Sequence, residues 1–105
     1  MSLFGIQNNK CFRPIIKIKG RHSFNSIAAG ESETFSIDLT PYTNYFPANE
    51  YPIITVTQVL GLSDTYNPDI TFSAYIDLNN ATANIVCHNN TGGRIDTRTI
   101  AYAVY

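Results

Sequence analysis

A chain of 105 residues has room for one domain with one hydrophobic core. Because 44% of the residues are hydrophobic and only 14% are charged, intrinsic disorder is excluded, since it requires low hydrophobicity and high charge. No stretch approaches the roughly 20 apolar residues of a membrane span. We therefore expect no membrane partner, and a surface with so little charge suits burial in an assembly.

The net charge of −1 conceals a division along the chain. Residues 23–105 carry a charge of −6, because all eight acidic residues lie there with only two arginines. An acidic body opposes a polyanion, so we expect no nucleic-acid partner. A basic segment joined to that acidic body favours docking between copies of the chain. An amphipathic strand with a basic outer face is the alternative explanation of the same charge pattern. The first 22 residues carry +5, from Lys10, Arg13, Lys17, Lys19 and Arg21.

The N-terminal residues differ from the rest of the chain in lacking any alternation of apolar and polar side chains. This predicts an arm at 1–13 followed by a domain at 14–105. A basic region followed by an apolar run is missing, so we expect no signal peptide and synthesis in a cytoplasm. Ile16 and Ile18 then alternate with basic residues, which predicts a strand.

Later strands are predicted by hydrophobic residues at every second position, because successive strand side chains point to opposite faces. Segment 53–60 differs, since it is apolar on both faces and rich in β-branched residues. That pattern indicates a central strand, or a strand covered by another subunit. The expected inward residues are Phe35, Ile37 and Leu39, then Ile70, Phe72, Ala74, Ile76 and Leu78, then Ala83, Ile85 and Cys87, and finally Ile100, Tyr102 and Val104.

Turn-forming residues separate these segments. Asn79 and Asn80 are suited to the positive-φ positions of a two-residue hairpin, and 89–93 predicts a longer hairpin loop. Helical spacing is missing throughout, apart from one short helical turn that we expect within 40–50. The pattern predicts an all-β fold, a single antiparallel β-sandwich of about seven short strands with an extended N-terminal arm.

Segment 41–52 is unusual in holding four aromatic residues and three prolines. A stiffened loop with tyrosines offers a large contact area at low entropic cost. Three interpretations remain open: the rings cap the end of the sandwich, contact a neighbouring subunit, or bind a glycan together with Asn44, Asn49 and Glu50. The candidate contact residues are Tyr42, Tyr45, Phe46 and Tyr51, and Tyr105 at the C-terminus follows the same reasoning.

Groups suited to catalysis or metal binding are scattered. His22 and His88 have no partner at a metal-ligand spacing. Asp64 and Asp69 share an oxygen-rich loop, but the loop lacks the turn glycine and the closing glutamate of a calcium site. Cys87 is predicted to be a buried thiol, and a disulfide with Cys11 remains open. We therefore expect no catalytic site, no metal and no cofactor, and hence no enzyme.

From Ile27 onward the order of features is similar to that of a known group of modules. A turn at 27–34 leads into an alternating strand, and 52–58, 70–78, the Asn90–Gly93 loop and the 100–104 ending follow. This order resembles the small β-sandwich modules, some similar to H-type lectins, of bacteriophage tail fibres and other virion appendages. The resemblance implies a homo-oligomeric, often trimeric, particle component. H-type lectin-like domains end on a strand with a tryptophan, which this chain lacks, so no ligand residues are transferred.

These observations together predict a non-enzymatic structural component of a bacteriophage particle, as a fibre, tail or capsid-attached module located in the virion. Its expected partners are other copies of itself and other virion proteins. The first alternative is a lectin-like receptor-binding module that recognises a host surface glycan. The second is a small glycan hydrolase that uses Asp64 and Asp69 as a carboxylate pair.

Overall fold

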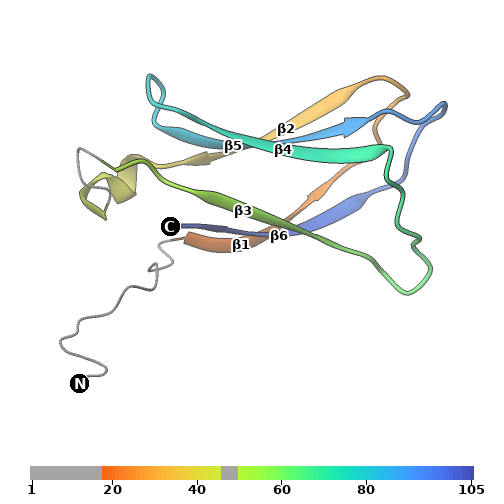
Figure 1. Ribbon diagram of the computed structural model, residues 1–105, viewed down its shortest axis with the longest axis horizontal. Helices are drawn as coiled ribbons and strands as arrows, with labels where there is room; N and C mark the ends of the chain where they lie inside the picture. The colour runs from red at the N-terminus through yellow and green to blue at the C-terminus, as the bar shows by residue number, and fades with distance from the viewer. Residues whose placement is uncertain (1–17, 46–49) are drawn as a thin grey trace.

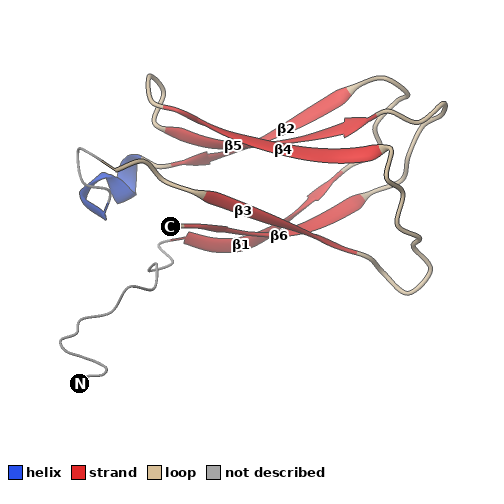
Figure 2. Ribbon diagram, in the orientation of Figure 1, coloured by secondary structure: helices blue, strands red, loops and turns tan. Residues whose placement is uncertain are grey.

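The computed structural model describes residues 18–45 and 50–105, so the arm expected at 1–13 lies outside the described residues. Two three-stranded antiparallel sheets face each other, and the described residues contain one short helix and no other (Figures 1 and 2). The predicted all-β sandwich is confirmed. Six strands lie in the described residues, against the expected number of about seven, and Ile27 and Ile95 form an isolated bridge outside them.

Each sheet has one central strand and two edge strands. The first sheet has the order β1-β6-β3, with β1 at Ile18–Phe24, β6 at Arg98–Val104 and β3 at Ile54–Val59. The second has the order β2-β5-β4, with β2 at Ser32–Asp38, β5 at Thr82–Asn89 and β4 at Ile70–Asp77. The two sheets bring β1 beside β2 and β3 beside β4 (Figure 1).

The core lies between the two sheets and is densest at the central strands. Ile85 on β5 and Ile100 and Val104 on β6 are fully buried. Their burial confirms the inward faces predicted for these strands, and Ile37 on β2 and the following Leu39 are buried as well. Four connections, β1–β2, β2–β3, β3–β4 and β5–β6, cross between the sheets, so most strand partners are distant in sequence. The hydrophobic pattern determines the face that each strand buries.

The inward face predicted for 70–78 is only partly confirmed. Ile70 is buried, and Phe72 and Ile76 are half-buried. Ala74 pairs with the buried Ile85 and so lies on the inner face, but it is exposed, because β4 is an edge strand. Leu78 is 64% exposed, since β4 has already ended at Asp77.

Segment 53–60 was predicted to be a central strand or one covered by another subunit. The first alternative is wrong, because β3 pairs only with β6 and forms an edge of its sheet. Ile54 and Val56 face the core and are half-buried, whereas Ile53 and Val59 point outward and are exposed. The outward apolar residues that suggested a central position therefore remain uncovered within the described residues.

The turn between β4 and β5 also differs from its prediction. It contains four residues, 78–81, and the positive φ, +54°, belongs to Ala81 and not to the two asparagines. The Asp77 carboxylate accepts hydrogen bonds from the amides of Asn79 (3.0 Å) and Asn80 (3.2 Å). The side chain of Asn80 donates a further bond at 2.7 Å, and this bond is the main reason that the pKa of Asp77 is lowered.

A short helical turn was expected within 40–50, and the 3₁₀ helix η1 at Thr40–Tyr45 confirms it. The Asp38 carboxylate accepts a hydrogen bond from the Thr40 amide at 2.9 Å, which starts the turn and lowers the pKa of Asp38.

Asn89 fastens two of the connections that cross between the sheets. Its side chain is fully buried, and its amide donates to the carbonyls of Ile27 (2.9 Å) and Gly93 (2.8 Å). Its carbonyl oxygen accepts from the Thr91 amide at 2.9 Å, so both ends of the side chain are satisfied. The β1–β2 and β5–β6 connections are thereby held together beside the Ile27–Ile95 bridge.

Candidate protein-binding site

The two long edges of the sandwich contain different chemical groups. Among the four edge strands, β1 carries Lys19 and Arg21, β2 carries Glu33 and Asp38, and β4 ends on Asp77. The remaining edge strand, β3, has the sequence Ile-Thr-Val-Thr-Gln-Val and carries no charge. Proteins commonly place charges on edge strands to prevent pairing with other chains. By that criterion β3 is the one unprotected edge strand in the described part of the chain.

At the β1–β2 edge, aromatic rings close the gap between the sheets. The rings of His22 and Phe35 stack with centroids 3.9 Å apart and planes 9° apart, and Phe24 meets His22 edge-on. Tyr102 packs against Phe35 from the other side and lies over Gly20, where a Cβ would come within 2.6 Å of the tyrosine hydroxyl. A depression of about 360 Å³ above this stack is lined mainly by polar groups.

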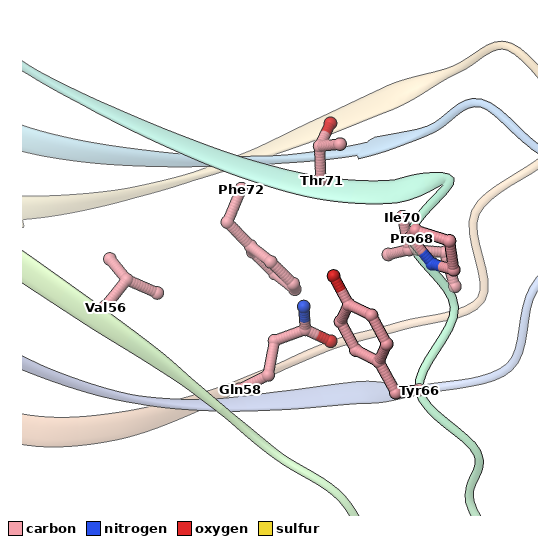
Figure 3. Close-up of a pocket in the computed structure, with 7 residues that line it drawn as sticks. All are labelled: Val56, Gln58, Tyr66, Pro68, Ile70, Thr71 and Phe72. Atoms are coloured by element: carbon pink, nitrogen blue, oxygen red, sulfur yellow. The ribbon is translucent and has the colours of Figure 1, made fainter.

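At the β3–β4 edge, the gap remains open as a cleft of about 330 Å³ (Figure 3). Val56 and Gln58 extend into it from β3, and Phe72 meets them from β4. Tyr66, from the connection between the two strands, points its hydroxyl into the cleft beside the Gln58 amide. The lining is completed by Pro68, Ile70 and Thr71. The cleft thus presents an amide, a phenol and apolar side chains, and no charge.

Exposed hydrophobic side chains are concentrated on this same edge. All the large hydrophobic residues that are exposed in the described part of the chain lie between residues 51 and 78. On β3 and its flank, Ile53 is 58% exposed and Val59 is 47% exposed. The full set is Tyr51, Ile53, Val59, Leu60, Leu62, Tyr66, Tyr75 and Leu78. Scattered exposed hydrophobics are ordinary, but a set confined to one edge marks a contact surface.

The backbone of β3 also has hydrogen-bonding groups directed toward solvent. Ile53 exchanges two hydrogen bonds with Tyr105, at 2.7 and 3.0 Å, and the register then alternates along the strand. Thr55, Thr57 and Val59 therefore direct their amides and carbonyls toward β6. Ile54, Val56 and Gln58 direct theirs away from the sheet, where no other described strand pairs with them.

The contact residues predicted from the sequence are only partly brought together. Tyr51 is 67% exposed, and it lies close to the Ile53–Tyr105 pair that starts the β3–β6 ladder. Tyr42 and Tyr105 are half-buried. Lys19 and Arg21 lie on β1, at the opposite edge of the same sheet. The side chains of Lys10, Arg13, Lys17, Tyr45 and Phe46 lie outside the described residues.

Sequence reasoning missed the strongest features of the surface, namely Ile53, Val59, Leu62 and Tyr66 together with the free amides of β3. One signal could have identified them. Residues 51–63 form a run without a single charged side chain, in a segment rich in β-branched residues. Such a run is typical of a strand that is covered on both sides or at its free edge.

The two carboxylates considered from the sequence, those of Asp64 and Asp69, lie in turns of the β3–β4 connection. Asp64 accepts a hydrogen bond from the Gly61 amide at 2.8 Å, and the Asn67 side chain accepts one from the Asp69 amide at 2.9 Å. Ser32 contacts Nδ1 of His88, but this pair lies on the outer face of its sheet, away from the two clefts. No group of three His, Cys, Asp or Glu side chains suited to a metal occurs within 18–45 and 50–105.

Cys87 is a free, fully buried thiol, as predicted. Burial, together with the charge of Glu33, raises the pKa of Cys87 to about 11, so the thiol is protonated and unreactive at neutral pH. Cys11 lies outside the described residues.

No family model, curated protein or solved structure matches the chain. Among the described residues, none of the helical structure is long and apolar enough to cross a bilayer. The functional argument therefore depends on the chemistry of the β3–β4 edge itself.

Proposed function

We propose that the protein is a non-enzymatic structural module that assembles through protein–protein contacts made by its β3–β4 edge. One observation carries this proposal: within the described residues, the exposed large hydrophobic side chains all lie in 51–78, around an edge strand without charge. Covering such a surface is favourable because it removes apolar area from water and satisfies the free backbone groups of β3. The expected partners are other copies of the chain and other proteins of the same assembly.

The assembly that we propose is a bacteriophage particle, in which the protein is a fibre, tail or capsid-attached component of the virion. Support comes from the order of strands and turns in the sequence, which resembles that of small virion-appendage modules. A chain with little surface charge also suits burial among neighbours. Mass spectrometry of purified particles tests this part: the protein should copurify with particles in fixed ratio, and its absence from them would remove the virion from the proposal without affecting the assembly surface.

Light scattering coupled to size exclusion tests the assembly surface. We expect the mass to rise with concentration and to fall to that of the monomer when Ile53 and Val59 are both replaced by lysine. The matched control places lysine at Ala29 and Thr34, which are exposed and lie in the β1–β2 connection and on β2. Loss of association in the control as well would show that added charge acts nonspecifically and would contradict the proposal.

Glycan recognition is a second candidate, favoured by the contents of the β3–β4 cleft. Gln58 and Tyr66 supply an amide and an aromatic ring with a hydroxyl at one opening, and these are groups that bind sugars in protein sites. The candidate predicts binding of the protein to a host surface glycan, with loss of binding in Tyr66→Ala. A glycan array on which the protein binds no sugar would contradict glycan recognition.

A further inference from the structure

We infer that two copies associate by antiparallel pairing of their β3 strands, about a two-fold axis at Val56. The two β1-β6-β3 sheets then become one continuous six-stranded sheet. This inference rests on the proposed assembly function and specifies both the partner, a second copy of this chain, and the register of contact.

The hydrogen-bonding groups of β3 allow this pairing without any change in the existing ladder. Ile54, Val56 and Gln58 already direct their amides and carbonyls away from β6. With the axis at Val56, the two Val56 residues form a hydrogen-bonded pair, and Ile54 of each copy pairs with Gln58 of the other. Each free group of the strand centre therefore acquires a partner.

The distribution of charge favours β3 over the other edge strands for pairing between two copies of the chain. Two β1 strands centred on Gly20 would bring Lys19 of each copy opposite Arg21 of the other, and pairing through β2 or β4 would place Glu33 and Asp38, or Asp77, in the contact. Like charges directly opposite each other destabilise a strand pair. Two β3 strands bring no charges together, so β3 is the edge strand of the described chain whose self-pairing places no charged side chain in the contact.

The register follows from the faces of the strand. Opposed residues in a sheet share one face, so outward residues must meet outward residues. An axis at Val56 places the exposed Ile53 opposite the second copy's Val59 and Thr55 opposite its Thr57, so that two exposed hydrophobic residues cover each other. An axis at Thr57 would instead place Ile53 opposite Gly61 and leave it uncovered.

Cysteine cross-linking tests the pairing and its register. In a Cys11→Ser background, Thr55→Cys and Thr57→Cys proteins are prepared separately and mixed under mild oxidation. Both positions are exposed, and Cys87 is buried. In the proposed register residues 55 and 57 form a non-hydrogen-bonded pair with Cα atoms about 4.5 Å apart, within disulfide range. We expect a disulfide-linked dimer in the mixture and little in either protein alone.

Other outcomes are equally decisive. A dimer formed by Thr57→Cys alone would place the axis at Thr57 and overturn the register. The Cys11→Ser parent is measured in parallel by light scattering. If the parent associates but no cross-link forms, the β3 pairing is wrong and the assembly function stands. If the parent remains monomeric at every concentration, the β3 pairing is wrong and copies of the chain are removed from the expected partners.

Val56→Pro provides a second test that does not need cysteine. Proline removes the Val56 amide, which points to the free edge, and leaves the β6 ladder intact. We expect the dissociation constant to rise about tenfold or more, with the β-sheet circular dichroism unchanged. Unchanged association in a folded Val56→Pro protein would contradict the pairing, and if this variant does not fold, the cross-linking result decides.

Discussion

The β1–β2 edge and the β3–β4 edge of the sandwich limit access to the same core in different ways. Along β1–β2, stacked rings line a polar depression and charged side chains flank it. Along β3–β4, the gap remains a neutral cleft and the strands display hydrophobic residues. One edge therefore has the features that keep a sheet monomeric, and the other lacks them. The difference indicates that the β3–β4 edge is the incomplete side of the molecule.

The largest loss of stability is expected when the buried Asn89, which holds the β1–β2 and β5–β6 connections together, is replaced. Asn89→Leu removes the bonds to Ile27 and Gly93 and leaves polar groups without partners, which should cost about 3 kcal/mol of unfolding free energy. Asn67→Ala, in the connection between β3 and β4, removes one turn bond and should cost about 1 kcal/mol. Urea denaturation of both variants measures the two losses of unfolding free energy. Equal losses would show that the connections around Asn89 and the β3–β4 connection are held equally firmly.

Two half-buried phenylalanines provide a matched comparison of the edges. Phe35 packs against the rings of His22 and Tyr102, at 3.9 and 5.5 Å, whereas Phe72 meets the ring of Phe24 at the longer distance of 6.0 Å. Phe35→Ala should therefore cost about 2.5 kcal/mol and Phe72→Ala about 1.5 kcal/mol. Thermal unfolding of both variants, measured in dilute protein, checks the order. A larger loss for Phe72 would mean that the β3–β4 edge is the better packed.

Gly20 allows the close approach of Tyr102 at the ring-stacked edge. A Cβ there would come within 2.8 Å of the ring carbon that bears the hydroxyl, so Gly20→Ala should displace the ring and cost about 1.5 kcal/mol. Gly92→Ala is the control, because nothing lies within 4 Å of the added Cβ. A Gly20→Ala protein as stable as the control would show that Tyr102 can move freely.

A small gain in stability is expected from a glycine substitution in the turn that joins β4 to β5. Ala81 has a φ of +54°, which is unfavourable for a residue with a Cβ and easy for glycine. Ala81→Gly should raise the unfolding free energy by about 0.5 kcal/mol, the relief of strain being partly offset by the greater freedom of the unfolded chain. Urea denaturation detects the change, and a loss of stability would mean that the turn is not strained at this residue.

Local alternation was sufficient to predict much of the fold. The inward faces of Ile37, Ile85 and Ile100 follow directly from period two, and the antiparallel sandwich follows from several such short strands separated by turns. The position of β3 could not be predicted in this way, because an apolar run reads the same in a central strand and in an uncovered edge strand. Sheet order depends on contacts between residues distant in sequence, and no local pattern encodes them.

The candidate site was predicted less well than the fold, for a related reason. Tyr51 was identified through its aromatic-rich segment, but Ile53 and Val59 were assigned to a strand that is central or covered by another subunit.

The conformation of the β4–β5 turn was also missed. Asn79 and Asn80 are the residues that favour a positive φ. The Asp77 side chain accepts hydrogen bonds from the backbone amides of both, and the positive φ occurs at Ala81 instead.

Amide hydrogen exchange of β3, resolved residue by residue by NMR at low and high protein concentration, tests the central claim most directly. Thr55 and Thr57 bond to β6 and should be protected at both concentrations. The amides of Ile54, Val56 and Gln58 should exchange rapidly in dilute protein and become protected as copies associate. If these three amides remain unprotected while the mass in solution rises, copies associate elsewhere and the account of the β3 edge is wrong.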